Sequence, residues 1–113
     1  MSEHILKIRK VDKPIFDLIK SGVKTIETRA ATDKYRNIQA KDKLVFHCEG
    51  QKVTKVVKTV YLFKSIKELL NKLPLTKILP GVKSFEEAEK VWVGFPNYPE
   101  KIKKYGLVAW ELE

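Results

Sequence analysis

The alternation of apolar and polar positions along the chain predicts a mixture of strands and helices. Alternating stretches predict β-strands at 4–10, 25–29, 43–49, 52–63 and 107–112. Helically spaced apolar residues predict helices at 13–21, 66–73 and 85–93. The order contains only one strand–helix–strand unit, so we expect an α+β fold whose strands curl into a small, largely antiparallel barrel flanked by helices.

Capping residues set the predicted helix ends. Asp12 is the expected N-cap of the first helix, with Pro14 in its first turn, and Gly22 is a natural left-handed stop. Ser65 and Ser84 each precede a glutamate by three residues, which is the pattern of a capping box.

The remaining segments are predicted as loops. Residues 30–42 are irregular, with one helical turn near 33–37, and residues 75–83 contain two turn residues. Residues 95–99 form a rigid loop that is followed by a short basic turn at 100–105. In the helix at 85–93, Phe85 and Trp92 are expected in the core.

The composition indicates one globular domain over residues 1–113. The apolar runs are too short for a membrane span, and no signal-peptide pattern is present, so we expect a cytoplasmic protein. Cys48 is the only cysteine, which excludes an intramolecular disulfide and a thiolate zinc cage. Because neighbouring strand residues face opposite sides, His47 and Cys48 do not chelate one ion together. We expect no metal and no cofactor.

The net charge of +9 comes mainly from lysine, with 23 basic against 14 acidic residues and a pI of 9.6. Such a balance is typical of nucleic-acid-binding domains. A Lys-rich and Gln-poor composition is also typical of a solvated, thermally adapted surface. Both interpretations stay open on composition alone.

Residues 21–29 hold the candidate chemistry. Strand alternation places Glu27 and Arg29 on one face, and Lys24 sits at the preceding turn, where its long side chain reaches back over that face. Two cations and one carboxylate are thus expected at the mouth of a strand. The alternative is an ordinary surface ion pair worth about 0–1 kcal/mol.

The pattern Gly-x-Lys-x-x-Glu-x-Arg, filled by Gly22, Lys24, Glu27 and Arg29, resembles the signature of the ASCH family (activating signal cointegrator homology domains). The helix before it, Asp42 before a strand, and the ending at 105–110 also resemble that family, so the resemblance spans nearly the whole chain. Two features depart from the family pattern. Lys41 replaces the usual glycine, and residues 31–38 have no counterpart that aligns.

The resemblance implies a PUA-like pseudo-barrel with a cleft that takes RNA or a nucleoside. In such a cleft Lys24 and Arg29 would bind phosphate, and Glu27 would orient Arg29 or accept from a base amino group. The first hypothesis is therefore an RNA- or nucleotide-binding domain that uses Gly22, Lys24, Glu27, Arg29 and an exposed aromatic residue, Tyr98. Other aromatic candidates for base stacking are Tyr35, Tyr61, Trp92, Phe95 and Tyr105.

Two other function classes stay open. Some relatives of this architecture are amidohydrolases that deacetylate N4-acetylcytidine with a lysine, a threonine and a glutamate. Lys24 matches that lysine, but Glu27 occupies the threonine position, and no acid lies at 77–84 for the glutamate. A ribonuclease would use Lys24 and Arg29 on the phosphate with Glu27 as the base. The third hypothesis is a protein-interaction module whose surface is rich in solvent-exposed lysine.

Overall fold

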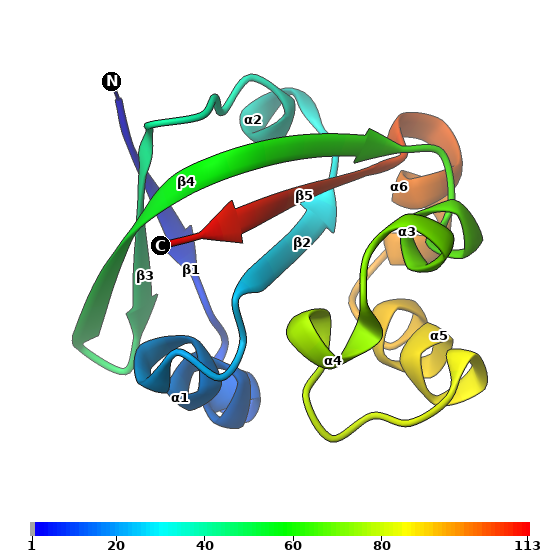
Figure 1. The fold of residues 1–113 in the computed structure, drawn as a ribbon, viewed down its shortest axis with the longest axis horizontal. Coiled ribbons are helices and arrows are strands. Elements are labelled where there is room, and N and C mark those ends of the chain that lie inside the picture. Colours follow the sequence, from blue (N-terminus) through cyan, green and yellow to red (C-terminus); the bar gives the residue numbers. More distant parts are fainter. Residues whose placement is uncertain (1) are drawn as a thin grey trace.

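The computed structural model describes residues 2–113 and contains a five-stranded mixed sheet that curves into a half-barrel (Figure 1). The strand order is β1-β3-β4-β5-β2; β1 and β3 are parallel, and the other neighbouring pairs are antiparallel. The strands are β1 (Glu3–Lys7), β2 (Ile26–Ala30), β3 (Lys43–Cys48), β4 (Gln51–Phe63) and β5 (Leu107–Leu112). The α+β class and the curled, largely antiparallel sheet are confirmed.

Strand β4 is long enough to pair with two neighbours in succession. Its first half pairs with β3 and its second half with β5. The register shifts between Val57 and Thr59, close to the point where the strand changes partner. An extra residue in one strand bends it and increases its twist, so this irregularity helps the sheet to curve.

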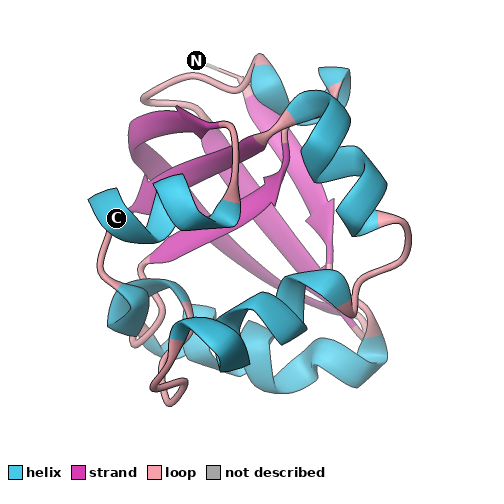
Figure 2. Cartoon of the chain, turned by 90° about the vertical axis from the view of Figure 1, so that its right-hand side faces the viewer, coloured by secondary structure: helices cyan, strands magenta, loops and turns pink. Residues whose placement is uncertain are grey.

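Helices cover one end and one side of the half-barrel, as Figures 1 and 2 show. Helix α1 lies at one end, α2 lies in the connection between β2 and β3, and α3 to α6 gather beside the sheet. The helices are α1 (Lys13–Ser21), α2 (Asp33–Arg36), α3 (Ile66–Lys72), α4 (Leu75–Ile78), α5 (Phe85–Val93) and α6 (Tyr98–Tyr105), and a 3-10 turn at Lys10–Asp12 precedes α1.

Side chains alternate between the two faces of β5, so this strand contributes to two apolar clusters. Val108 and Trp110 point into the half-barrel, where they pack with residues of β1, β3 and α1 such as Phe16. Leu107 and Ala109 point to the other face, where they pack with α3 to α6. Because both clusters share one strand, the side of the molecule formed by α3 to α6, which we call the helical side, is fixed to the half-barrel.

Several predicted element ends are confirmed. Gly22 ends α1 in the left-handed conformation, and the hydroxyl oxygens of Ser65 and Ser84 accept from the amides three residues later. The helical turn near 33–37 is present as α2. The predicted strands match those observed to within a few residues.

Other predictions were wrong at the level of single elements. The first strand ends at Lys7 instead of residue 10, because the 3-10 turn follows closely. Asp12 does not cap α1 with its side chain; its carboxylate pairs with the Arg9 side chain at 2.8 Å. Phe85 is 41% exposed rather than buried, because it occupies the first position of α5.

The segments predicted as loops contain two further helices. Helix α4 lies within 75–83, and α6 replaces the end of the predicted rigid loop and the basic turn. Asn97 has a φ of 61° before α6, and Pro99 lies in its first turn, where a missing N–H costs little. Both helices supply residues or backbone groups to the site described below.

Candidate functional site

The sharp turn after α1 brings the motif residues to the start of β2. The N–H groups of Val23 and Lys24 both donate to the carbonyl of Leu18, so the chain reverses directly after the helix. Gly22 permits this reversal with a φ of 82°, a conformation that is least costly for glycine. Gly22 thus shapes the turn, and it is not among the residues that line the cavity described below.

Lys24 is buried, with its side chain 2% exposed, and its ammonium lies beside Glu27 inside the fold. Its Nζ donates to the carbonyl of Ile26 at 2.8 Å and to the carbonyl of Ile78 at the end of α4. It also lies 3.6 Å from Oε1 of Glu27. An ammonium group has three N–H donors; the two carbonyls take two of them, and the Glu27 carboxylate lies close to the ammonium as an ion pair.

Burial changes the pKa of the Lys24 amine. Removal from water lowers the pKa of the Lys24 amine below its ordinary value of 10.5, and the nearby Glu27 carboxylate opposes that shift. The two carbonyl acceptors also favour the protonated, donating form. Lys24 therefore holds Glu27 and the end of α4 in fixed positions.

Glu27 lies between the two cations of the motif. Its Oε1 accepts from the Thr28 N–H at 2.8 Å, and its Oε2 lies 3.7 Å from Nη2 of Arg29. The structure thus brings Lys24, Glu27 and Arg29 together around one buried carboxylate. A buried carboxylate without such partners would carry a large desolvation cost.

Arg29 extends from β2 toward β1 and α2. Its Nη1 lies 3.5 Å from the Tyr35 hydroxyl and its Nη2 lies 3.4 Å from the carbonyl oxygen of Lys7. The guanidinium carbon lies 5.6 Å from the centroid of the Tyr35 ring, within the range of a cation–π contact. These contacts hold the guanidinium partly buried at the side of the half-barrel, where β1 and β2 do not pair.

Aromatic residues of the helical side stand opposite the motif. The Trp92 indole N–H donates to Oγ1 of Thr28 at 3.0 Å, which fixes α5 to β2. Tyr98 is half-buried on α6, and its hydroxyl accepts from the Ala30 N–H at 3.4 Å. Burial raises the pKa of Tyr98, so this residue stays a neutral phenol. Its ring meets that of Phe95 edge to face, with 5.1 Å between centroids.

A cavity of about 290 Å³ lies between the motif and these aromatic residues, and we call it the motif cavity. Its size is near the lower end of the range for small-ligand sites. The predicted candidates that line it are Lys24, Glu27, Arg29, Tyr35, Trp92, Phe95 and Tyr98. Tyr61 and Tyr105 lie elsewhere: the Tyr61 hydroxyl donates to Glu111, and Tyr105 packs against the half-barrel core.

Two cations that border the motif cavity, Lys7 and Arg9, were not identified from the sequence, and a third, Lys101, was predicted only as part of the basic turn at 100–105. Lys7 and Arg9 border it from β1 and the segment after it, and the Arg9 guanidinium lies 5.3 Å from the Phe95 ring centroid. Lys101 borders it from α6. The spacing of Tyr98 and Lys101 could have indicated that both face the site, because residues three apart lie on one side of a helix.

Within residues 2–113, no group of three or more His, Cys, Asp or Glu side chains is placed to hold a metal ion. Cys48 is buried. None of the helices in that range combines the length and the apolar character that a membrane crossing requires.

Comparison with known proteins identifies the family. The sequence-family model of the ASCH domain matches residues 10–113. The crystal structure of hypothetical protein PH0355 has a TM-score of 0.85 and 37% identity, covering 100% of this chain and 98% of that one. The solution NMR structure of protein PF0455 from Pyrococcus furiosus has a TM-score of 0.76 and 39% identity, covering 98% and 96%. No curated protein matches the chain.

These similarities agree with the motif at Gly22–Arg29 and with the PUA-like half-barrel that the resemblance implied. The chain belongs to the ASCH domain family.

Proposed function

We propose that this chain binds RNA or a nucleotide in the motif cavity. The observation that carries the proposal is the fixed guanidinium of Arg29 beside a wall of aromatic side chains. A planar guanidinium matches the geometry of a phosphate group, and aromatic rings stack with unpaired bases. The basic net charge of +9 and membership of the ASCH family support the same function.

The motif residues have different roles in this proposal. Arg29 contacts a phosphate, and Tyr98 and Phe95 contact the base or the ribose. Glu27 keeps Arg29 oriented and offers its remaining acceptor capacity to a base amino group. Lys24 is a positioning residue, because its donors already face the carbonyls of Ile26 and Ile78 and the carboxylate of Glu27.

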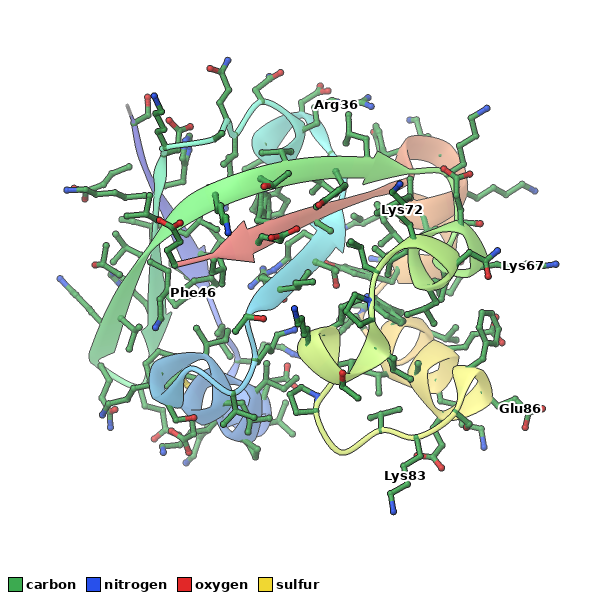
Figure 3. The ribbon with its side chains drawn as sticks, viewed as in Figure 1. Arg36, Phe46, Lys67, Lys72, Lys83 and Glu86 are labelled. Carbon is green, nitrogen blue, oxygen red and sulfur yellow. The ribbon has the colours of Figure 1, made fainter. Side chains whose placement is uncertain are left out.

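The proposal is tested by binding of a fluorescein-labelled pentauridine, measured by fluorescence anisotropy. Arg29→Met should weaken binding at least tenfold, because a charge-assisted contact contributes about 1.5–3 kcal/mol. Arg36→Met is the matched control, since Arg36 is exposed on α2 and points away from the sheet (Figure 3). Equal affinities for the two variants and the unmodified protein would contradict the proposal.

Hydrolysis is a second candidate function, because the buried amine of Lys24 and the carboxylate of Glu27 both border the cavity. Burial lowers the pKa of Lys24, which moves the amine toward the form that accepts a proton. The test is turnover of N4-acetylcytidine and of RNA by the protein and by Lys24→Ala, with folding checked by circular dichroism. Product formed equally by a folded Lys24→Ala variant would exclude a catalytic role for this lysine.

A further inference from the structure

A second hollow adjoins the motif cavity along the free edge of β1. Among residues 2–113, this strand lies at the end of the sheet and pairs only with β3. The second hollow has a volume of about 440 Å³ and lies between β1 and the α2 segment, from which Lys34, Tyr35 and Ile38 line it. Lys7 and Tyr35 line both hollows, so the two meet at these residues, which we call the junction.

Basic residues from three elements border the junction. Arg29 of β2 contacts the Tyr35 hydroxyl and the Lys7 carbonyl. The Nζ of Lys34 on α2 lies 5.3 Å from the centroid of the same Tyr35 ring. Lys7 borders both hollows from β1. The junction therefore presents the guanidinium of Arg29 and the ammonium of Lys34 at one aromatic ring, and Lys7 borders the same place from β1.

The acidic residues of the two hollows are distributed unevenly. Glu27 and Asp12 belong to the motif cavity, and each is already paired with an arginine. Glu3 is in the second hollow, four residues along β1 from Lys7. Neither Lys7 nor Lys34 forms a salt bridge with the acidic residues in the described chain. An anion bound at the junction would reduce the repulsion between Arg29 and Lys34, which lie at the same Tyr35 ring.

We infer that the ligand is a single-stranded oligonucleotide of at least two nucleotides rather than a free nucleoside. This inference rests on the proposed function. One nucleotide occupies the motif cavity, its phosphodiester crosses the junction at Lys7, Arg29 and Lys34, and the next nucleotide enters the second hollow. A single strand is required because a base enters the motif cavity only when it is unpaired.

The test compares two double variants that remove the same charge. Lys7→Ala/Lys34→Ala removes two cations from the junction, and Lys67→Ala/Lys83→Ala removes two exposed lysines that project from the helical side (Figure 3). Each protein is titrated with labelled pentauridine by anisotropy at several salt concentrations. Each is also titrated with uridine 5′-monophosphate by NMR, to follow the amides of 27–30.

The junction double variant should bind pentauridine roughly tenfold more weakly than the control double variant. Its slope of log affinity against log salt should be shallower by about 0.7 for each phosphate group that the variant no longer neutralises. The shifts that the mononucleotide causes at 27–30 should stay unchanged.

Equal pentauridine affinity and equal salt slopes for the two double variants would overturn the inference. If the mononucleotide still shifted 27–30 in that case, the proposed function of the motif cavity would survive. If Arg29→Met also left the binding of both ligands unaffected, the proposed function itself would fail.

Discussion

Lys24 joins two parts of the chain that are 54 residues apart. Its ammonium donates to Ile78 on the helical side and to Ile26 on β2, and it lies beside the buried carboxylate of Glu27. A lysine in this environment is costly unless every donor has a partner. The motif therefore has a structural role, in which the lysine fixes the geometry that Glu27 and Arg29 require.

Lys24→Met should lower the free energy of unfolding by roughly 3–5 kcal/mol. The change keeps most of the side-chain volume, but it removes the cation of a buried pair and leaves two carbonyls without their donor. Lys83→Met is the control, since Lys83 is exposed and its replacement should change stability by less than about 0.5 kcal/mol. Urea denaturation measures both, and equal midpoints would show that the Lys24 contacts contribute little.

Asp42 makes the fold sensitive to acid. Its carboxylate accepts from the N–H groups of Gln39 and Ser2 and pairs with His4 at 2.9 Å. These contacts lower the pKa of Asp42 from 3.8 to about 2. Because the folded state holds the proton less tightly than the unfolded chain, this stabilisation is complete above pH 3.8 and is lost as the pH falls through about 2.

Asp42→Asn should therefore be less stable than the unmodified protein at pH 6, by roughly 1–3 kcal/mol. The difference should shrink as the pH falls from about 4 to about 2, which urea denaturation at several pH values would reveal. A stability difference that is constant over this range would contradict the role assigned to the carboxylate.

At the scale of elements, the sequence predicted what local patterns determine. The strands follow from alternation, and the starts of α3 and α5 follow from Ser65 and Ser84. Helices α4 and α6 were not predicted, because the proline and glycine residues in these segments indicated loops. Packing against the sheet stabilises short helices there.

The site shows the same division between local and long-range information. The turn and the positions of Glu27 and Arg29 follow from the segment itself. The burial of Lys24 could not be predicted, because its partner at Ile78 lies on a helix distant in sequence. The contributions of Lys7 and Arg9 depend on how β1 lies relative to β2, which only the assembled sheet determines.

The connection between α6 and β5 depends on one close approach. Gly106 has a φ of 79°, and a Cβ at this position would collide with the backbone carbonyl of Phe63 at the end of β4. Gly50, in the turn between β3 and β4, has nearly the same φ of 80° but open space around a Cβ. Replacing each glycine by alanine therefore distinguishes the free-energy cost of a positive φ, which both positions share, from the cost of the steric contact, which is present at Gly106 and absent at Gly50.

Gly50→Ala should cost about 1–2 kcal/mol through backbone strain alone. Gly106→Ala should cost clearly more, because the β4–β5 pairing must also shift to accommodate the methyl group. Thermal unfolding of the two variants measures the difference. Equal decreases in stability would show that the backbone at Gly106 adapts to a side chain.

At the scale of the whole molecule, the charge of +9 has two separable components. Lysines spread over the surface attract any polyanion weakly, whereas Arg9 and Arg29 at the motif cavity are held close to the rings of Phe95 and Tyr35. The first component gives binding without a fixed location. The second gives binding at one place, and the proposed function depends on it.

Binding of pentauridine should fall steeply with salt, because contacts to phosphate release counterions. Each neutralised phosphate steepens the slope of log affinity against log salt by about 0.7, which corresponds to a roughly 2.6-fold decrease in affinity between 50 and 200 mM. Anisotropy titrations at these two concentrations measure the slope. Affinity that is independent of salt would exclude a binding mode led by phosphate.

The most direct measurement of the central claim is an NMR amide titration of the protein with pentauridine. The account predicts that the largest shifts fall on residues 24–29 and on the facing segment 92–101, which supply much of the lining of the motif cavity. Weak shifts spread over the exposed lysines, with none concentrated at these segments, would contradict it. The positive charge would then be a solvated coat, and a protein partner would be the next ligand to test.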